Sequence, residues 1–207
     1  MIIENSLTST PTTDSKAATP ISHRLTSSDG RLSIAFHWRK DRYDHVIALV
    51  NGAKNQSLYR SVNGSIDEDW PASPAIQQIS TETIDDKTTV LGVGCCGTSH
   101  FSVSVQPATT RDGSEAIRFE WAVRLSKELS QSEIEAIEGF WLGTTYLAAK
   151  SSDPWRPNNP YQFHPMDNAG FEMTKQEVQT NYCLRPLQTA DQRTIQWSYF
   201  VQPKPGN

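Results

Sequence analysis

The stretch Val90–Pro107, VLGVGCCGTSHFSVSVQP, decides the fold, because two incompatible structures can be drawn from it. Its three glycines match G-x-G-x-x-G, the pattern that precedes a helix in dinucleotide-binding folds. After Gly97, however, apolar and polar residues alternate to the end of the stretch. On a helix, apolar residues two positions apart would point about 200° away from each other and share no face. The stretch therefore predicts two antiparallel strands joined at 96–99, which argues against a nucleotide site.

The glycines then need another explanation. A glycine inside a strand marks a bulge, or a place where another backbone or a bulky side chain comes close. A kinase-type glycine loop would also run as strand, turn and strand, but no lysine strand, catalytic aspartate loop or metal-binding aspartate follows it in this chain of 207 residues. We therefore expect the glycines to serve close packing.

The same two-residue period recurs along most of the chain. It is clear in RLSIAFHW (Arg31–Trp38), AIRFEWAVRL (Ala116–Leu125) and RTIQWSYFV (Arg193–Val201). Turn signals such as Asn51-Gly52 separate these runs. The pattern predicts about nine or ten short strands in an all-β fold, either an antiparallel two-sheet β-sandwich or an open barrel.

Only one segment has the signals of a helix. Ser130 and Glu133 have the spacing of a capping box, in which each side chain bonds to the other's backbone amide. Ile134 and Ile137 lie three apart, and Gly139 follows as a stop signal. We expect one short α-helix near 130–138.

Composition divides the chain into a tail and one domain. Residues 1–19 are rich in Ser and Thr and poor in apolar side chains, so they are expected to form a disordered N-terminal tail. Residues 20–207 are expected to form a single β-rich domain. Within it, 151–170 is rich in proline and aromatic residues, which predicts an arm without regular structure that packs on the body.

Charge and composition exclude several partners. The net charge is −4 and the cationic residues are scattered, which argues against nucleic acid. No run of about 18 apolar residues and no signal peptide is evident, so we expect a cytoplasmic chain without a membrane span. Three cysteines are too few for a disulfide framework. The sequence does not indicate an oligomeric state.

The thiols and histidines show no established motif. Alternation places Cys95 in a row with Leu91 and Val93, so Cys95 is expected to face the core and Cys96 the outside. A nucleophilic pair of Cys96 with His100 stays open as an alternative. No G-x-S-x-G elbow and no pair of residues at zinc-ligand spacing is present, so no metal and no cofactor is expected.

Polar residues opposite the apolar rows are the best candidates for a binding surface. If their strands share a sheet, these polar residues form one face. Such a face suits a hydroxyl-rich ligand such as a sugar. Trp121 and Trp197 fall on apolar rows and are expected in the core with Trp38, whereas Trp70 lies in a loop as a candidate platform. The candidate ligand-binding residues are His37, His100, Arg118, Glu120, Trp155 and Tyr161.

Two functions follow from this surface. The first is a non-catalytic β domain that binds a polar small molecule or a protein partner through the polar face. The second is an enzyme acting on a carbohydrate or acyl substrate, with His100 or His37 and Glu120 as acid and base groups. The enzyme would need His100 and Glu120 within about 3 Å, directly or through one water, in a cleft.

Overall fold

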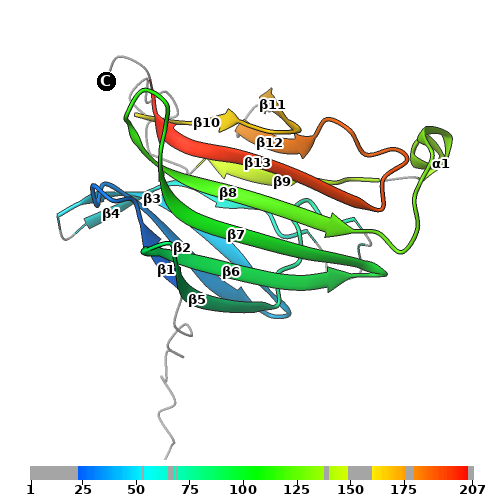
Figure 1. Ribbon diagram of the computed structural model, residues 1–207, viewed down its shortest axis with the longest axis horizontal. Helices are drawn as coiled ribbons and strands as arrows, with labels where there is room; N and C mark the ends of the chain where they lie inside the picture. Colours follow the sequence, from blue (N-terminus) through cyan, green and yellow to red (C-terminus); the bar gives the residue numbers. More distant parts are fainter. Residues whose placement is uncertain are drawn as a thin grey trace, which may run out of the picture.

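The computed structural model describes residues 23–52, 54–64, 68, 70–137, 140–148, 160–175 and 180–204. These residues form two antiparallel sheets of seven and six strands, arranged as an open sandwich. Figure 1 shows the six-stranded sheet in front of the seven-stranded one. The all-β, two-sheet fold predicted from the alternation is confirmed. The predicted tail 1–19 lies outside the described residues.

The seven-stranded sheet contains the first four strands of the described chain together with three strands from its C-terminal half. In spatial order its strands are β1 (Arg24–Thr26), β2 (Leu32–Arg39), β3 (Arg42–Asn51), β4 (Lys54–Ser61), β9 (Thr144–Ala148), β12 (Thr180–Pro186) and β11 (Ala169–Lys175).

The six-stranded sheet is built around the stretch that decided the fold. Its order is β10 (Tyr161–Pro165), β13 (Thr194–Pro203), β8 (Glu115–Arg124), β7 (Ser99–Thr109), β6 (Lys87–Cys96) and β5 (Gln78–Ile84). The strands β6 and β7 pair as a hairpin in which Cys96 lies opposite Ser99, at the bend that the alternation predicted.

The described residues contain 13 strands, more than the nine or ten expected. Two of the additional strands, β10 and β11, overlap the proline-rich arm, where we expected no regular structure. Pro160 precedes β10 and Pro165 ends it, and β10 is an edge strand. A proline at such a position removes no hydrogen bond that an inner strand would need, so the prolines are compatible with a strand. Residues 151–159 of the arm lie outside the described residues.

The helix matches its prediction. It is α1 (Gln131–Ala136), with Ser130 as the N-cap residue and both bonds of the capping box present. Among the described residues, no helix has the length and apolar character that a bilayer crossing requires.

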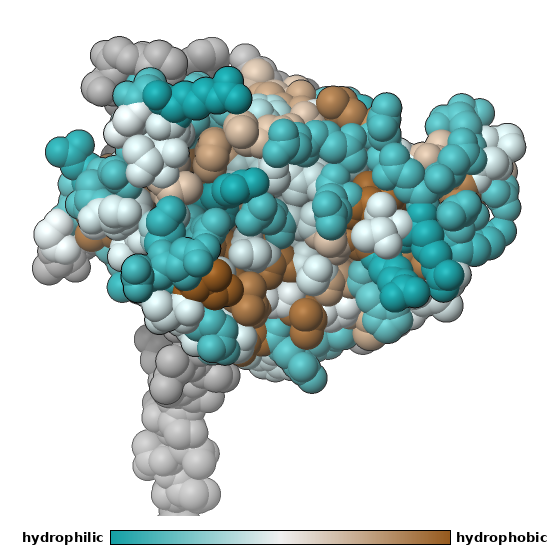
Figure 2. Space-filling view, in the orientation of Figure 1, coloured by the Kyte–Doolittle hydropathy of each residue, from teal (hydrophilic) through white to brown (hydrophobic). Residues whose placement is uncertain are grey.

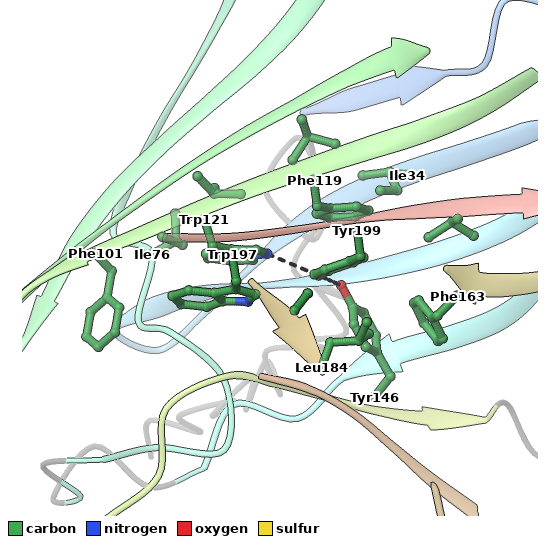
Figure 3. Packing of buried hydrophobic residues seen from close by; sticks show 14 of the residues in the cluster. Ile34, Ile76, Phe101, Phe119, Trp121, Tyr146, Phe163, Leu184, Trp197 and Tyr199 are labelled. Atoms are coloured by element: carbon green, nitrogen blue, oxygen red, sulfur yellow. Dashed lines mark hydrogen bonds between the residues drawn. The ribbon is translucent and has the colours of Figure 1, made fainter. Parts of the chain in front are cut away.

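Aromatic side chains fill the space between the sheets (Figure 3). The Trp121 and Trp197 rings stack with their centroids 6.0 Å apart, and Phe119 stacks on Tyr199 at 4.9 Å. Trp121 and Trp197 are buried as predicted, and each such ring removes a large apolar area from water, whereas Trp38, also expected in the core, is only half-buried. Trp70 is no exposed platform, because it is half-buried and packs on Phe140 at 4.6 Å.

The orientation of β6 differs from the prediction. Cys96 is buried and Cys95 is exposed, so the row of Leu91, Val93 and Cys95 faces outward. The inner row contains Gly92 and Gly94. Ile76 occupies the place of a side chain at Gly92, and the backbone of Ala75 occupies the place of a side chain at Gly94. Close packing explains these glycines, as the sequence predicted. The same packing turns the apolar row away from the core.

Four buried polar side chains connect the two sheets. His45 Nε2 lies 2.6 Å from Tyr146 Oη, and both residues belong to the seven-stranded sheet. Tyr146 Oη lies 2.6 Å from Tyr199 Oη across the interface, and the indole N–H of Trp121 donates to Tyr199 Oη at 3.0 Å. Each group has a partner, which removes much of the cost of burying it.

Candidate functional site

The candidate ligand-binding residues that the structure describes lie on two different outer faces and in the core. His100 on β7, with Arg118 and Glu120 on β8, belongs to the outer face of the six-stranded sheet. His37 lies on β2 of the other sheet and does not converge with them. Tyr161 is 4% exposed and points into the core, so it offers no surface for a ligand. Trp155 lies outside the described residues.

Sequence alternation could not reveal this division. It shows which side chains share the face of one strand, but it does not show which strands share a sheet. The expected continuous polar face is therefore correct for β7, β8 and β13 and wrong for β2.

The outer face of the six-stranded sheet contains an elongated shallow depression, here called the outer depression. It consists of two adjoining hollows of about 630 Å³ and about 510 Å³. Val93, Ser102 and Ala122 line both hollows and lie side by side across β6, β7 and β8. Three small neighbouring side chains leave the sheet surface low at this point, so they form the floor.

Longer side chains border this floor on both sides. One border is the cross-strand row of Cys95, His100 and Arg124. The other includes Arg118 and Glu120, joined by an ion pair of 2.8 Å between Nη2 and Oε1. Both charges of this pair are partly exposed, so the ion pair itself contributes little to stability.

The turn between β10 and β11 forms a wall of the second hollow. Asp167 and Asn168 both line it. The side-chain amide of Asn168 donates to the backbone carbonyl oxygen of Gln196 at 2.9 Å. The backbone N–H of Ser198 donates to the backbone carbonyl oxygen of Asp167 at 3.2 Å. These bonds fix the turn against β13. Residues 151–170 were expected to form an arm without regular structure, so this wall was not predicted, although an Asp-Asn dipeptide favours a turn.

Among the residues that line the second hollow, Trp197 has an unpartnered Nε1, but its ring lies in the core. Two further polar atoms have no hydrogen-bond partner among the described residues. They are Arg118 Nε and Ser198 Oγ, and both are buried. Ser198 is only 5% exposed. A buried donor or hydroxyl without a partner costs about 1–3 kcal/mol, so such groups are usually satisfied by something. The residues that line the hollow therefore retain unused hydrogen-bonding capacity just below its surface. Alternation along Arg193–Val201 predicts that Ser198 lies opposite the apolar row and on the polar face, but nothing in the sequence marks it as unpaired.

Figure 2 shows the same face as a mainly hydrophilic surface with apolar side chains between the polar ones. Val93 on the floor is apolar and 48% exposed. A ligand on this face would therefore meet both hydrogen-bonding groups and apolar contacts.

The alternative of a Cys96 nucleophile paired with His100 is wrong. Cys96 is buried, and its thiol lies 2.7 Å from the carbonyl oxygen of Glu68. It is Cys95 that lies directly across from His100 on the outer face. Its thiol is 3.5 Å from Gln77 Oε1.

The acid–base pair required by the enzyme alternative is not formed. His100 lies opposite Arg124, whereas Glu120 lies opposite Ser104, four residues further along the same two strands. Four residues of strand span about 13 Å, which is far beyond a hydrogen bond or one bridging water. Glu120 instead pairs with Arg118.

No group of three or more metal-ligating side chains suited to an ion occurs among the described residues. Comparison of the chain with protein families, with characterised proteins and with solved structures finds no match. The function must therefore be argued from the geometry alone.

Proposed function

We propose that the protein is a non-catalytic β-sandwich binding module that holds a hydroxyl-rich small molecule in the outer depression. The observation that carries this proposal is the pair of buried, unpartnered polar atoms, Arg118 Nε and Ser198 Oγ, in the second hollow. A ligand hydroxyl can both donate and accept, so it suits a guanidinium N–H and a serine hydroxyl at the same time.

The shape of the outer depression supports this ligand class. The volumes of the two hollows lie in the range of small-molecule sites. Val93 and Ala122 on the floor offer apolar contact to the C–H groups of a sugar-like ring, and the polar borders offer hydrogen bonds. Tyr161 lies in the core, and Trp155 lies outside the described residues. The proposal therefore does not depend on aromatic stacking.

The test is a titration of ¹⁵N-labelled protein with a panel of neutral mono- and disaccharides, followed by NMR. We expect saturable shifts confined to the amides of the outer depression. Ser102→Trp should abolish these shifts, because Ser102 is exposed on the floor and an indole would fill the depression without entering the core. Ser33→Ala on β2 is the control on the other sheet and should leave binding unchanged.

The absence of a saturable shift across the panel would overturn the proposal, as would equal binding by the Ser102→Trp variant.

One observation then favours a protein partner as the second candidate. Gln78 belongs to the edge strand β5 and lines the first hollow, so a partner strand added at that edge would extend the same face.

A further inference from the structure

A second cluster of polar side chains lies on the outer face of the seven-stranded sheet, where β2, β3 and β4 run side by side. Asp44 of β3 is at its centre, and only 5% of its side chain is exposed. His37 lies directly opposite Asp44 on β2. Arg39 and Arg60 reach Asp44 diagonally from the two neighbouring strands. This cluster faces away from the outer depression and takes no part in the function proposed above.

Asp44 holds both guanidinium groups through one carboxylate oxygen. Arg39 Nε donates to Asp44 Oδ2 at 2.9 Å. Arg60 Nε and Nη2 donate to the same oxygen at 2.9 Å and 2.7 Å. These are charge-assisted hydrogen bonds, which are shorter and stronger than neutral ones. They fix the orientation of two long side chains that would otherwise be free to rotate.

The cluster carries more positive than negative charge. Two guanidinium groups, those of Arg39 and Arg60, face the single carboxylate of Asp44. A structural ion pair would need only one guanidinium group. Burial of the His37 ring is the largest cause that lowers its pKa below 6.5. The ring is therefore neutral near neutral pH and does not change the charge of the cluster. Asp41, the nearest acid along the chain, is already paired with Arg42 at 2.8 Å.

The unused donors of the cluster face solvent. The side chains of Arg39 and Arg60 are 43% and 47% exposed. Within the described part of the chain, both Nη groups of Arg39 and the Nη1 group of Arg60 have no hydrogen-bond acceptor. Guanidinium N–H groups in a fixed plane match the oxygens of phosphate or carboxylate groups.

We propose that Arg39 and Arg60, braced by Asp44, form a binding site for an oxyanion group of the phosphate type. Because Asp44 already orders both arginines, an incoming anion would not have to immobilise them, which favours binding. The chain as a whole carries a net charge of −4, so its overall field opposes anions. Attraction at this position must therefore be local.

The experiment is a titration of the full chain with inorganic phosphate at constant ionic strength, with the Nε–Hε signals of the arginines followed by NMR. We expect saturable shifts at Arg39 and Arg60. The variant Arg60→Gln should weaken binding at least tenfold. The matched control is Arg111→Gln, which removes an exposed arginine from the turn between β7 and β8 and should change nothing.

A second variant tests the brace. Asp44→Asn removes a negative charge, so simple Coulomb attraction predicts tighter phosphate binding, whereas loss of the brace predicts binding at least fivefold weaker. Far-UV circular dichroism establishes that the variant is folded. Parallel titration with O-phosphoserine identifies the source, since a tighter complex than with inorganic phosphate assigns a phosphate carried by a larger molecule, and equal affinity assigns the free ion.

Three results would overturn the proposal. One is the absence of saturation at Arg39 and Arg60, and another is an equal response of Arg111. The third is tighter binding by Asp44→Asn. None of these outcomes concerns the outer depression, so the two proposals stand or fall separately.

Discussion

At the scale of the residue, His45 is the most constrained titratable group of the core. It is 3% exposed, and burial lowers its pKa from 6.5 to about 4. The ring is therefore neutral near neutral pH. Because the indole N–H of Trp121 can only donate, the bonds form a consistent chain if Tyr199 donates to Tyr146 and Tyr146 donates to His45 Nε2. A proton on Nε2 would turn this acceptor into a donor, so the bond between His45 and Tyr146 would have to reverse its direction.

This burial makes stability depend on pH in a defined window. Above pH 6.5 the ring is neutral in both the folded and the unfolded protein, so His45 adds no pH dependence. Between pH 6.5 and about 4 the unfolded state binds a proton that the folded state does not, and the free energy of unfolding should fall by about 3 kcal/mol. Urea unfolding measured at several pH values checks this. His45→Gln should flatten the decline.

The matched control for this variant is His164→Gln, because His164 is exposed on β10. It should keep the wild-type decline between pH 6.5 and about 4. If His45→Gln retained the same decline as the wild type, the buried histidine would not be its source.

At the scale of the element, β6 shows what alternation predicts and where it fails. The two-residue period correctly gave a strand and a hairpin with β7. It assigned the inner face by the apolar side chains of Leu91 and Val93, because a glycine carries no side chain to count. In the structure, the space left by Gly92 and Gly94 is occupied by residues 75–76. That contact is non-local, so no pattern within β6 could reveal it.

Gly94→Ala should therefore be strongly destabilising. A Cβ at this position would overlap the carbonyl group of Ala75 and approach the Gln77 backbone nitrogen to 2.9 Å. Since backbone atoms cannot rotate away, the two segments must separate, at a cost of about 1–3 kcal/mol. Urea denaturation followed by tryptophan fluorescence measures it. Val93→Ala, one residue away on the exposed face, should change stability by no more than about 0.5 kcal/mol, and an equally small effect of Gly94→Ala would contradict the packing argument.

At the scale of the whole molecule, the sequence predicted two sheets but not their membership. Each strand shows its own apolar row, yet the pairing of β4 with β9 and of β8 with β13 depends on contacts far apart in sequence. For this reason His37 was grouped with His100, although the two lie on opposite outer faces. The unpaired state of Ser198 is also a whole-molecule property, since it requires the turn at 167–168 to cover β13.

The sheet edges are the other whole-molecule feature, and they differ in how they are protected. Of the four edge strands among the described residues, β1 has three residues, and β10 is bounded by two prolines. The edge strand β11 contains Glu172 and Lys175. The edge strand β5, QISTETI, has seven residues, mostly exposed, and Glu82 is its only charge. Short length, proline and charge all discourage pairing with another chain, so β5 depends on Glu82 most.

Glu82→Val should therefore increase self-association without lowering stability, because Glu82 is exposed and makes no described contact with the core. The replacement adds a β-branched apolar residue to a free edge that already contains isoleucine and threonine. Light scattering over time at a fixed protein concentration should show faster growth of large particles, with an unchanged thermal midpoint by circular dichroism. Glu128→Val removes the same charge from the exposed loop before α1 and should stay as soluble as the wild type. Equal association of both variants would assign the effect to net charge rather than to the β5 edge.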